Sequence, residues 1–266
     1  MPHPLGIESR TVAGMGPVEH IRLAAELGCT RVSLGLAQDA GSNTGYPAWS
    51  LREDAALRRA VRAALAETGI CIKVGEGVAA SDLVSPAQRA GDFDLFAEIG
   101  AKRISAHDNG LERARARDQL GELATMAQER GMDLSIIFAP VLTIRSLPEA
   151  LELVHEIGED KVSLTIDALH FFRTGGTVRQ IAELDAALVG HARICDGALS
   201  GNAEGDSRSP RLIPGEGDLP LREFVDALPR GKTLGIDVTL PQAALGFEAA
   251  KDYVGEVVAR TRALLA

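Results

Sequence analysis

Cysteine and aromatic residues are scarce in this chain. Its 266 residues include three cysteines and one tryptophan, and 4% of all residues are aromatic. The cysteines, Cys29, Cys71 and Cys195, show no CxxC spacing, which excludes a disulfide framework and a cysteine-based structural zinc site. The sequence also lacks a signal-peptide pattern and any apolar run near the ~18 residues of a membrane span. We therefore expect a cytoplasmic protein without a membrane anchor.

Positive charge is in deficit as well. Lys and Arg total 28 against 37 for Asp and Glu, so the net charge is −9. This is the wrong sign for neutralising the phosphates of a nucleic acid, and we expect a small-molecule substrate instead. With 45% hydrophobic and 24% charged residues, the composition is that of a globular protein with a large core.

A recurring boundary divides the chain. An amphipathic segment ends at a glycine, and an apolar strand begins within a few residues. The six boundary glycines are Gly28, Gly69, Gly100, Gly131, Gly158 and Gly231. Because the residue after a helix often takes a left-handed conformation, each of these glycines predicts a helix-to-strand turn.

Two further strands, near residues 5–8 and 192–195, bring the number to about eight, and the last helix is predicted over 249–264. This count predicts an α/β fold: a single (β/α)8 TIM barrel over residues 1–266, with parallel strands inside an outer ring of helices. A doubly wound open sheet uses the same alternation. The absence of GxGxxG after the first strand and the even recurrence of the units favour the closed barrel.

Charged residues end several of the predicted strands, although a parallel strand buried on both faces should be apolar. They are His107, Asp108, Asp167, His170, Arg193, Asp196 and Asp237, with Glu8, Lys73 and Glu76 as weaker candidates. In a barrel these strand ends meet at the face that carries the active site. Any one of them is equally well explained as a buried ion pair or a helix cap. Burying the whole set has an unfavourable free energy unless the charged groups bind a ligand. The remaining histidines, His3, His20, His155 and His191, are predicted to be surface or packing residues.

Two long loops leave the same face. Residues 37–50 carry Tyr46 and Trp49, and residues 196–219 carry Arg208 and Arg211. Loops of this length are more often functional lids than accidents, and plain surface insertions are the alternative.

The stretch TIDALHFFRTGG over residues 165–176, followed by RLIPGEGDLPL over 211–221, resembles the sugar phosphate isomerase/epimerase superfamily, the xylose isomerase-like barrels. The likeness is strong from about residue 134 onward. It implies a barrel that acts on a sugar, polyol or hydroxy-keto compound, often by isomerisation, epimerisation or dehydration.

The resemblance also implies a metal site that this chain departs from. Such relatives commonly hold a divalent metal with Glu, Asp, His and Glu on the fifth to eighth strands. The matching positions here are Ile137, Asp167, Arg193 and Asp237. Isoleucine cannot ligate a metal, and the fixed charge of arginine repels one. His170 and Arg211 match positions that contact substrate oxygens in relatives.

These residues predict an isomerase or lyase that moves a proton next to a carbonyl without the usual complete metal site. We expect Arg193 to stand where the cation's charge would be and to donate, with His170 and Arg211, to a developing oxyanion. Asp167 and Asp237 would orient these groups or act as base and acid. The residues expected to bind substrate are His107, Arg211, Trp49, Tyr46 and Phe138.

Three alternatives remain open. In the first, a metal site for Mn²⁺ or Mg²⁺ is rebuilt from Asp167, Asp196, Asp237 and His107. In the second, the barrel binds a small molecule without catalysis, and Arg193 forms a structural ion pair with Asp167 or Asp237. The third, a metal-dependent DNA-repair nuclease on the same barrel, is disfavoured by the negative charge. The sequence identifies neither a cofactor nor an oligomeric state. Among oligomers, the homodimer is the commonest.

Overall fold

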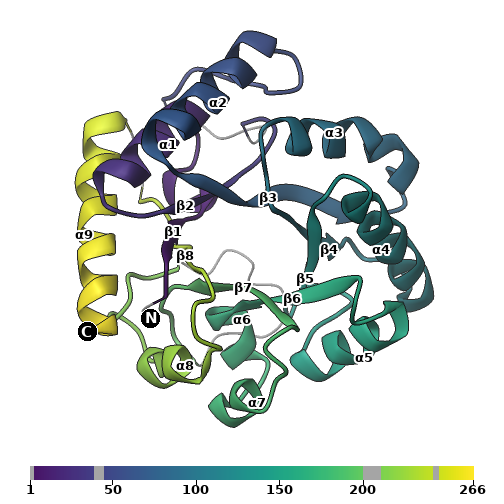
Figure 1. Cartoon of the computed structure of the whole chain (residues 1–266). Coiled ribbons are helices and arrows are strands. Elements are labelled where there is room, and N and C mark those ends of the chain that lie inside the picture. Colours follow the sequence, from purple (N-terminus) through teal and green to yellow (C-terminus); the bar gives the residue numbers. More distant parts are fainter. Residues whose placement is uncertain (1–2, 39–44, 200–210, 242–245) are drawn as a thin grey trace.

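A computed structural model describes residues 3–38, 45–199, 211–241 and 246–266. Eight parallel strands pair in chain order and close into a barrel, with β8 returning to β1 (Figure 1). This confirms the closed barrel over the open sheet. The strands are β1 (Leu5–Ile7), β2 (Arg31–Leu34), β3 (Cys71–Ala80), β4 (Arg103–Asp108), β5 (Asp133–Ile137), β6 (Val162–Asp167), β7 (Val189–Ile194) and β8 (Leu234–Ile236).

Helices surround the barrel and cover the outer face of the sheet (Figure 1). The α-helices are α1 (Pro17–Glu26), α2 (Ala55–Thr68), α3 (Ala90–Glu98), α4 (Arg113–Gln128), α5 (Leu147–Ile157), α6 (Ala168–Arg173), α7 (Val178–Ala182), α8 (Leu221–Ala227) and α9 (Phe247–Leu265). Two short 3-10 helices, η1 (Ser9–Val12) and η2 (Pro86–Arg89), follow β1 and β3. Within the described ranges, no helix is both long and apolar enough to cross a membrane.

The predicted helix-to-strand turns are confirmed. All six boundary glycines have positive φ, from 66° at Gly28 to 122° at Gly158. The structure differs from the sequence prediction mainly in β3, where the apolar pattern stops at Val74 but the strand continues to Ala80. Gly75, Glu76 and Gly77 interrupt that pattern, whereas backbone pairing with β4 carries the strand on.

The barrel interior is polar. Because side chains alternate along a strand, every second residue points inward. Small hydroxyl side chains occupy the middle of the barrel, and the Ser135 Oγ lies 2.8 Å from the Thr165 Oγ1 across β5 and β6. The apolar core lies instead between the strands and the helices, where Phe93, Phe138 and Phe224 are fully buried.

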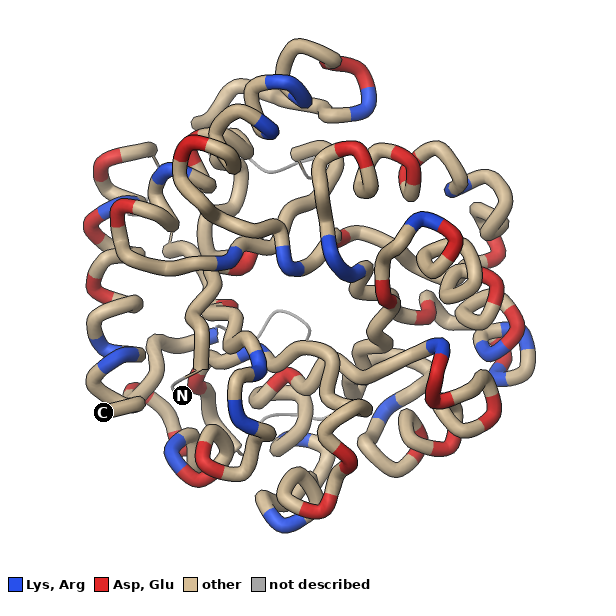
Figure 2. The backbone as a smooth tube through the Cα atoms, viewed as in Figure 1, with Lys and Arg blue, Asp and Glu red and all other residues tan. Residues whose placement is uncertain are grey.

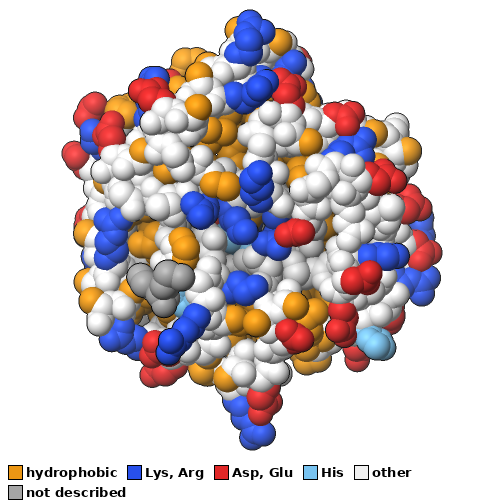
Figure 3. All heavy atoms as spheres, viewed as in Figure 1, with side chains coloured by type: hydrophobic (Ala, Val, Ile, Leu, Met, Phe, Trp, Pro, Cys, Tyr) orange, Lys and Arg blue, Asp and Glu red, His pale blue; other side chains and the backbone are white. Residues whose placement is uncertain are grey.

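Charged residues follow two distributions. Acidic and basic residues are interspersed along the outer helices (Figure 2). At the amino end of the barrel, basic side chains gather around the barrel axis (Figure 3). The opposite end, where the strands terminate, carries the charged residues predicted for the active-site face, except Lys73, which lies near the start of β3 at the amino end.

Candidate active site

Two buried ionic clusters fill the carboxyl end of the barrel. Asp167 on β6 pairs in register with Arg193 on β7, and Asp237 directly follows β8. The sequence analysis placed these residues at one end of the barrel, and the structure confirms that location. Their partners differ from those expected.

The first cluster is centred on Arg211. Its Nη1 lies 2.8 Å from an oxygen of Asp167 and 3.3 Å from one of Asp237. Its Nη2 lies 3.0 Å from the Nε2 of His170. Thr239 holds the arginine backbone in place through two hydrogen bonds of 3.0 Å each. The cation that stands between the two retained acidic positions is therefore Arg211, which corrects the expectation for Arg193.

Charge pairing fixes the protonation states in this cluster. Burial on its own would raise the pKa of Asp167, but the positive charge of Arg211 holds that pKa well below its usual range. Burial lowers the pKa of His170, which leaves a neutral ring able to accept the hydrogen bond from Arg211. Asp167 thus stays ionised and has no proton to give near neutral pH.

The second cluster is centred on Arg193, whose side chain crosses the barrel interior from β7. Its Nε lies 3.3 Å from an oxygen of Glu8, after β1, and its Nη2 donates to Glu76 on β3. Glu8 in turn lies 2.8 Å from the Nε2 of His191. From the sequence, Glu8 and Glu76 are only weaker candidates and His191 is a predicted surface or packing residue, yet all three belong to this cluster.

The two glutamates titrate in opposite directions. Burial raises the pKa of Glu8, but His191 and Arg193 outweigh it and bring the pKa to about 2. Burial raises the pKa of Glu76 to about 7; the charges of Glu8 and Asp237 add to the rise, and Arg193 opposes it. Glu76 is therefore a carboxyl group that exchanges a proton near neutral pH.

A glycine on β8 makes room for the second cluster. A Cβ built on Gly235 would lie 1.8 Å from the Glu8 Oε1 and 2.9 Å from the His191 Nε2. We expect Gly235→Ala to displace this buried pair and to destabilise the protein by about 1–3 kcal/mol, measured by urea unfolding. Gly121→Ala, inside α4 with its nearest neighbour 3.7 Å away, is the control and should stabilise by about 0.5–1 kcal/mol. Equal effects in the two variants would contradict the close packing around Gly235.

A cavity of about 570 Å³ opens next to these clusters, at the carboxyl ends of β1, β2 and β3 and beside the segment after β8. Glu76 lies in its wall with a side chain that is 20% exposed. Arg10 lines the same cavity, and its Nε lies 3.4 Å from Asp237. Trp49 forms part of the wall and donates a hydrogen bond to the Gly14 carbonyl oxygen. The volume suits a small molecule.

The other residues expected to bind substrate lie outside the cavity wall. Phe138 is 1% exposed and belongs to the core. Tyr46 is half-buried against that core. His107 is partly buried beside Asp108, and burial lowers its pKa. Arg208 lies outside the described residues.

Two aspartates at strand ends hold loops in place. Asp196 accepts hydrogen bonds from the backbone N–H groups of Gly197, Gly215 and Leu219. Asp108 accepts them from Thr143 and Ile144, in the segment after β5. These contacts use the carboxylate oxygens of Asp196 for the backbone and account for its burial without a metal.

The positions that correspond to metal ligands in relatives do not fit a divalent cation. Ile137 offers no ligand atom, Arg193 places a cation beside the site, and Arg211 already bridges Asp167 and Asp237. In the part of the chain that the structure describes, no three His, Cys, Asp or Glu residues lie together as a metal-binding group. Asp167, Asp196, Asp237 and His107, all among the described residues, do not form such a group in this structure.

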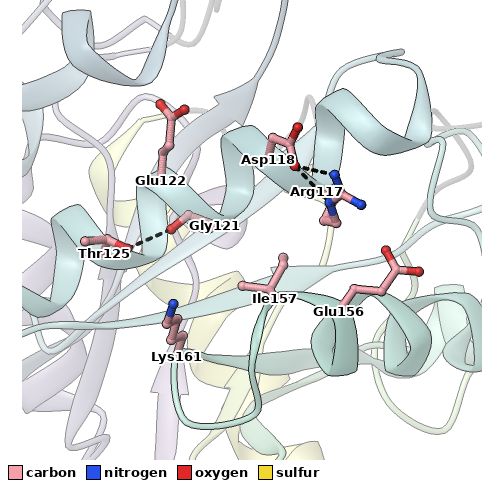
Figure 4. A pocket seen from close by; sticks show the side chains of 8 residues that line it. All are labelled: Arg117, Asp118, Gly121, Glu122, Thr125, Glu156, Ile157 and Lys161. Carbon is pink, nitrogen blue, oxygen red and sulfur yellow. Dashed lines mark hydrogen bonds and ion pairs between the residues drawn. The ribbon is translucent and has the colours of Figure 1, made fainter.

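A second cavity, of about 320 Å³, lies on the outside between α4 and α5. Figure 4 shows its wall, where Arg117 pairs with Asp118 and the Thr125 hydroxyl donates to the Gly121 carbonyl oxygen. It lies on the helix ring, away from the strand ends, and holds none of the buried charged groups.

Comparison with known proteins shows which family this barrel belongs to. The family model described as the xylose isomerase-like TIM barrel matches residues 21–242. The chain belongs to this family. The sequence resemblance is thereby confirmed, and the departures at Ile137 and Arg193 are departures within the family.

Individual relatives of this xylose isomerase-like barrel are distant. An inosose isomerase of Bacillus velezensis is 26% identical over 117 residues, which cover 41% of this chain and 39% of that protein's length. The zinc-binding IolI protein superposes with a TM-score of 0.75 at 15% identity, covering 99% of this chain and 96% of the other. The 3-keto-D-glucoside 4-epimerase YcjR of E. coli superposes with a TM-score of 0.70 at 15% identity, covering 96% and 98%. At these identities the superpositions show the shared fold.

Proposed function

We propose that this protein is an isomerase or lyase that moves a proton at the carbon next to a carbonyl group of a keto-sugar, a keto-polyol or a related hydroxy-keto compound. Membership of the family and the partial likeness to an inosose isomerase support this substrate class. The fold shared with a keto-glucoside epimerase agrees with it. The observation that carries the proposal is Glu76, a carboxyl group in the wall of the cavity with a pKa near neutrality.

Glu76 acts as the base. Its carboxylate takes the proton from the carbon next to the carbonyl, and the electron pair moves onto the carbonyl oxygen to give an enediolate. Arg10, in the same cavity wall, supplies positive charge for that oxygen. In an isomerisation, Glu76 returns the proton to the former carbonyl carbon while the hydroxyl proton on the neighbouring carbon passes to the former carbonyl oxygen. In a dehydration, Glu76 gives the proton to a hydroxyl on the β-carbon, which leaves as water as the carbonyl re-forms.

The two ionic clusters position this base. Arg193 holds Glu76 through the hydrogen bond from its Nη2 and is held in turn by Glu8. Arg211 keeps Asp167 and Asp237 as a fixed pair of buried charges, and Asp237 contributes to the raised pKa of Glu76. Arg193, Asp167, Asp237 and His170 are therefore positioning residues in this proposal, and no step passes through a metal.

The test is exchange of the proton next to the carbonyl for deuterium in D2O, followed by NMR over a panel of keto-sugars and keto-polyols. Catalysed exchange that survives dialysis against EDTA supports the proposal. Exchange that is lost on chelation and returns with a stoichiometric metal overturns the metal-free form of it.

The pH dependence follows from the direction of the Glu76 shift. Because the base must be ionised and its pKa is raised to about 7, kcat/KM should rise as pH increases through about 7 and then level off. An unperturbed glutamate would give a plateau already above pH ~5. A profile that is flat between pH 5.5 and 8 would contradict the assignment.

A further inference from the structure

A cluster of basic residues occupies the amino end of the barrel, opposite the candidate active site. It comprises Arg31 at the start of β2, Lys73 on β3, Arg103 at the start of β4 and Lys232 just before β8. Figure 2 shows basic positions where β2, β3 and β4 begin, and Figure 3 shows the side chains gathered over the middle of that face. We call this set the basic floor.

The strand geometry turns these side chains toward the barrel axis. The Cβ of Arg31 lies 3.1 Å from the inward Cβ position of Gly6 on β1, so Arg31 points inward. Lys73 is the extra residue of a bulge: Ile72 pairs with Val32 and Val74 with Ser33, which leaves Lys73 without a partner on β2. Bulges re-aim side chains, and this one adds an amine to the basic floor.

Arg103 closes the barrel beneath the others. Its side chain is 10% exposed and reaches across from β4, where Nη1 donates to the Gly190 carbonyl oxygen on β7. Its Nη2 lies 2.7 Å from an oxygen of Asp133, and its buried Nε has no hydrogen-bond partner within the described chain. Arg103 thus brings a fixed positive charge and an unsatisfied N–H donor to the basic floor.

Negative charge does not balance the basic floor. Asp133 is paired with Arg103 and has a side chain that is 68% exposed, and Asp185 lies near Lys232. Neither Lys73 nor Lys232 forms an ion pair with any residue that the structure describes. Burial, followed by the charge of Arg103, lowers the pKa of Lys73, and the negative charge of Asp133 opposes this only in part. This excess of positive charge occurs in a chain whose net charge is −9.

We propose that the basic floor is a binding site for a compact polyvalent oxyanion of the phosphate type. The flexible amines of Lys73 and Lys232 and the guanidinium of Arg31 surround the ion, and Arg103 supplies the charge beneath it. The site is separate from the proposed catalytic groups and shares no residue with them.

The experiment measures the thermal midpoint of the whole protein against inorganic phosphate, with sodium chloride at matched ionic strength as the reference. A ligand that binds only the folded state raises the midpoint with the logarithm of its concentration once that exceeds the Kd, by ~5 °C at ~100 times the Kd. Wild type is expected to show this rise with phosphate and not with chloride.

The variant Lys73→Met/Lys232→Met should lose the phosphate-dependent rise. Its midpoint in phosphate-free buffer should equal or exceed that of wild type, because the substitutions remove repulsion between like charges. Lys161→Met/Lys251→Met, which removes two lysines elsewhere, should keep the full response. Equal responses to phosphate and chloride in wild type would overturn the proposal, and so would an undiminished phosphate response in Lys73→Met/Lys232→Met. If that double variant does not fold, the single variant Lys232→Met repeats the test.

Discussion

Replacing Glu76 with glutamine is expected to lower turnover by about 100- to 10,000-fold with the fold intact. Glutamine has the same shape and keeps an oxygen to accept the hydrogen bond from Arg193, but it cannot take a proton. Because the loss falls on proton transfer, we expect kcat to fall and KM to change little. Deuterium exchange into the best substrate of the panel measures the effect.

A matched control separates this loss from a general effect of removing a carboxylate. Glu122 lies on the exposed face of α4, and Glu122→Gln should exchange deuterium at the wild-type rate. If Glu76→Gln retains wild-type exchange, the base lies elsewhere, although the family and the barrel stand.

Arg211→Met is expected to destabilise the protein by about 3–5 kcal/mol, because it leaves Asp167 and Asp237 as buried carboxylates without their shared cation. Both aspartates have side chains that are 2% exposed or less, so water cannot replace the lost contacts. Equilibrium unfolding in urea measures the change, with wild type as the reference.

Two further variants test the cause of that loss. Arg179 pairs with Glu183 on the surface, with side chains 84% and 60% exposed, and Arg179→Met should cost less than about 1 kcal/mol. Adding Asp167→Asn and Asp237→Asn to Arg211→Met should recover part of the stability, since it removes the buried charges that have lost Arg211. A cost for Arg211→Met no larger than that for Arg179→Met would contradict the buried cluster.

The limits of the sequence prediction are clearest at the two arginines. Arg193 ends a strand, and its place inside the barrel follows from position alone. Arg211 lies in a long loop, 17 residues beyond the end of β7 at Ile194, and no periodicity locates such a residue. Its position depends on the pairing of its backbone with Thr239, a contact between segments far apart in the chain.

The same reason explains why Glu76 was ranked below the aspartates. The sequence shows a glutamate between two glycines, after an apolar run that had ended at Val74. Only the pairing of β3 with β4 on both sides of Glu76 carries that segment to the rim of the cavity, and only burial, together with the neighbouring Arg193, Glu8 and Asp237, sets its pKa.

The sequence by itself determined the barrel, its helix-to-strand turns and the end at which charged side chains gather, because these follow from local periodicity and from glycines that tolerate a positive φ. The tertiary structure alone decided which carboxylate meets which guanidinium, which acid keeps a proton near neutral pH and where the basic floor forms. Those outcomes depend on distances between residues on different strands and on their shared burial, and neither quantity is encoded in any single segment of the chain.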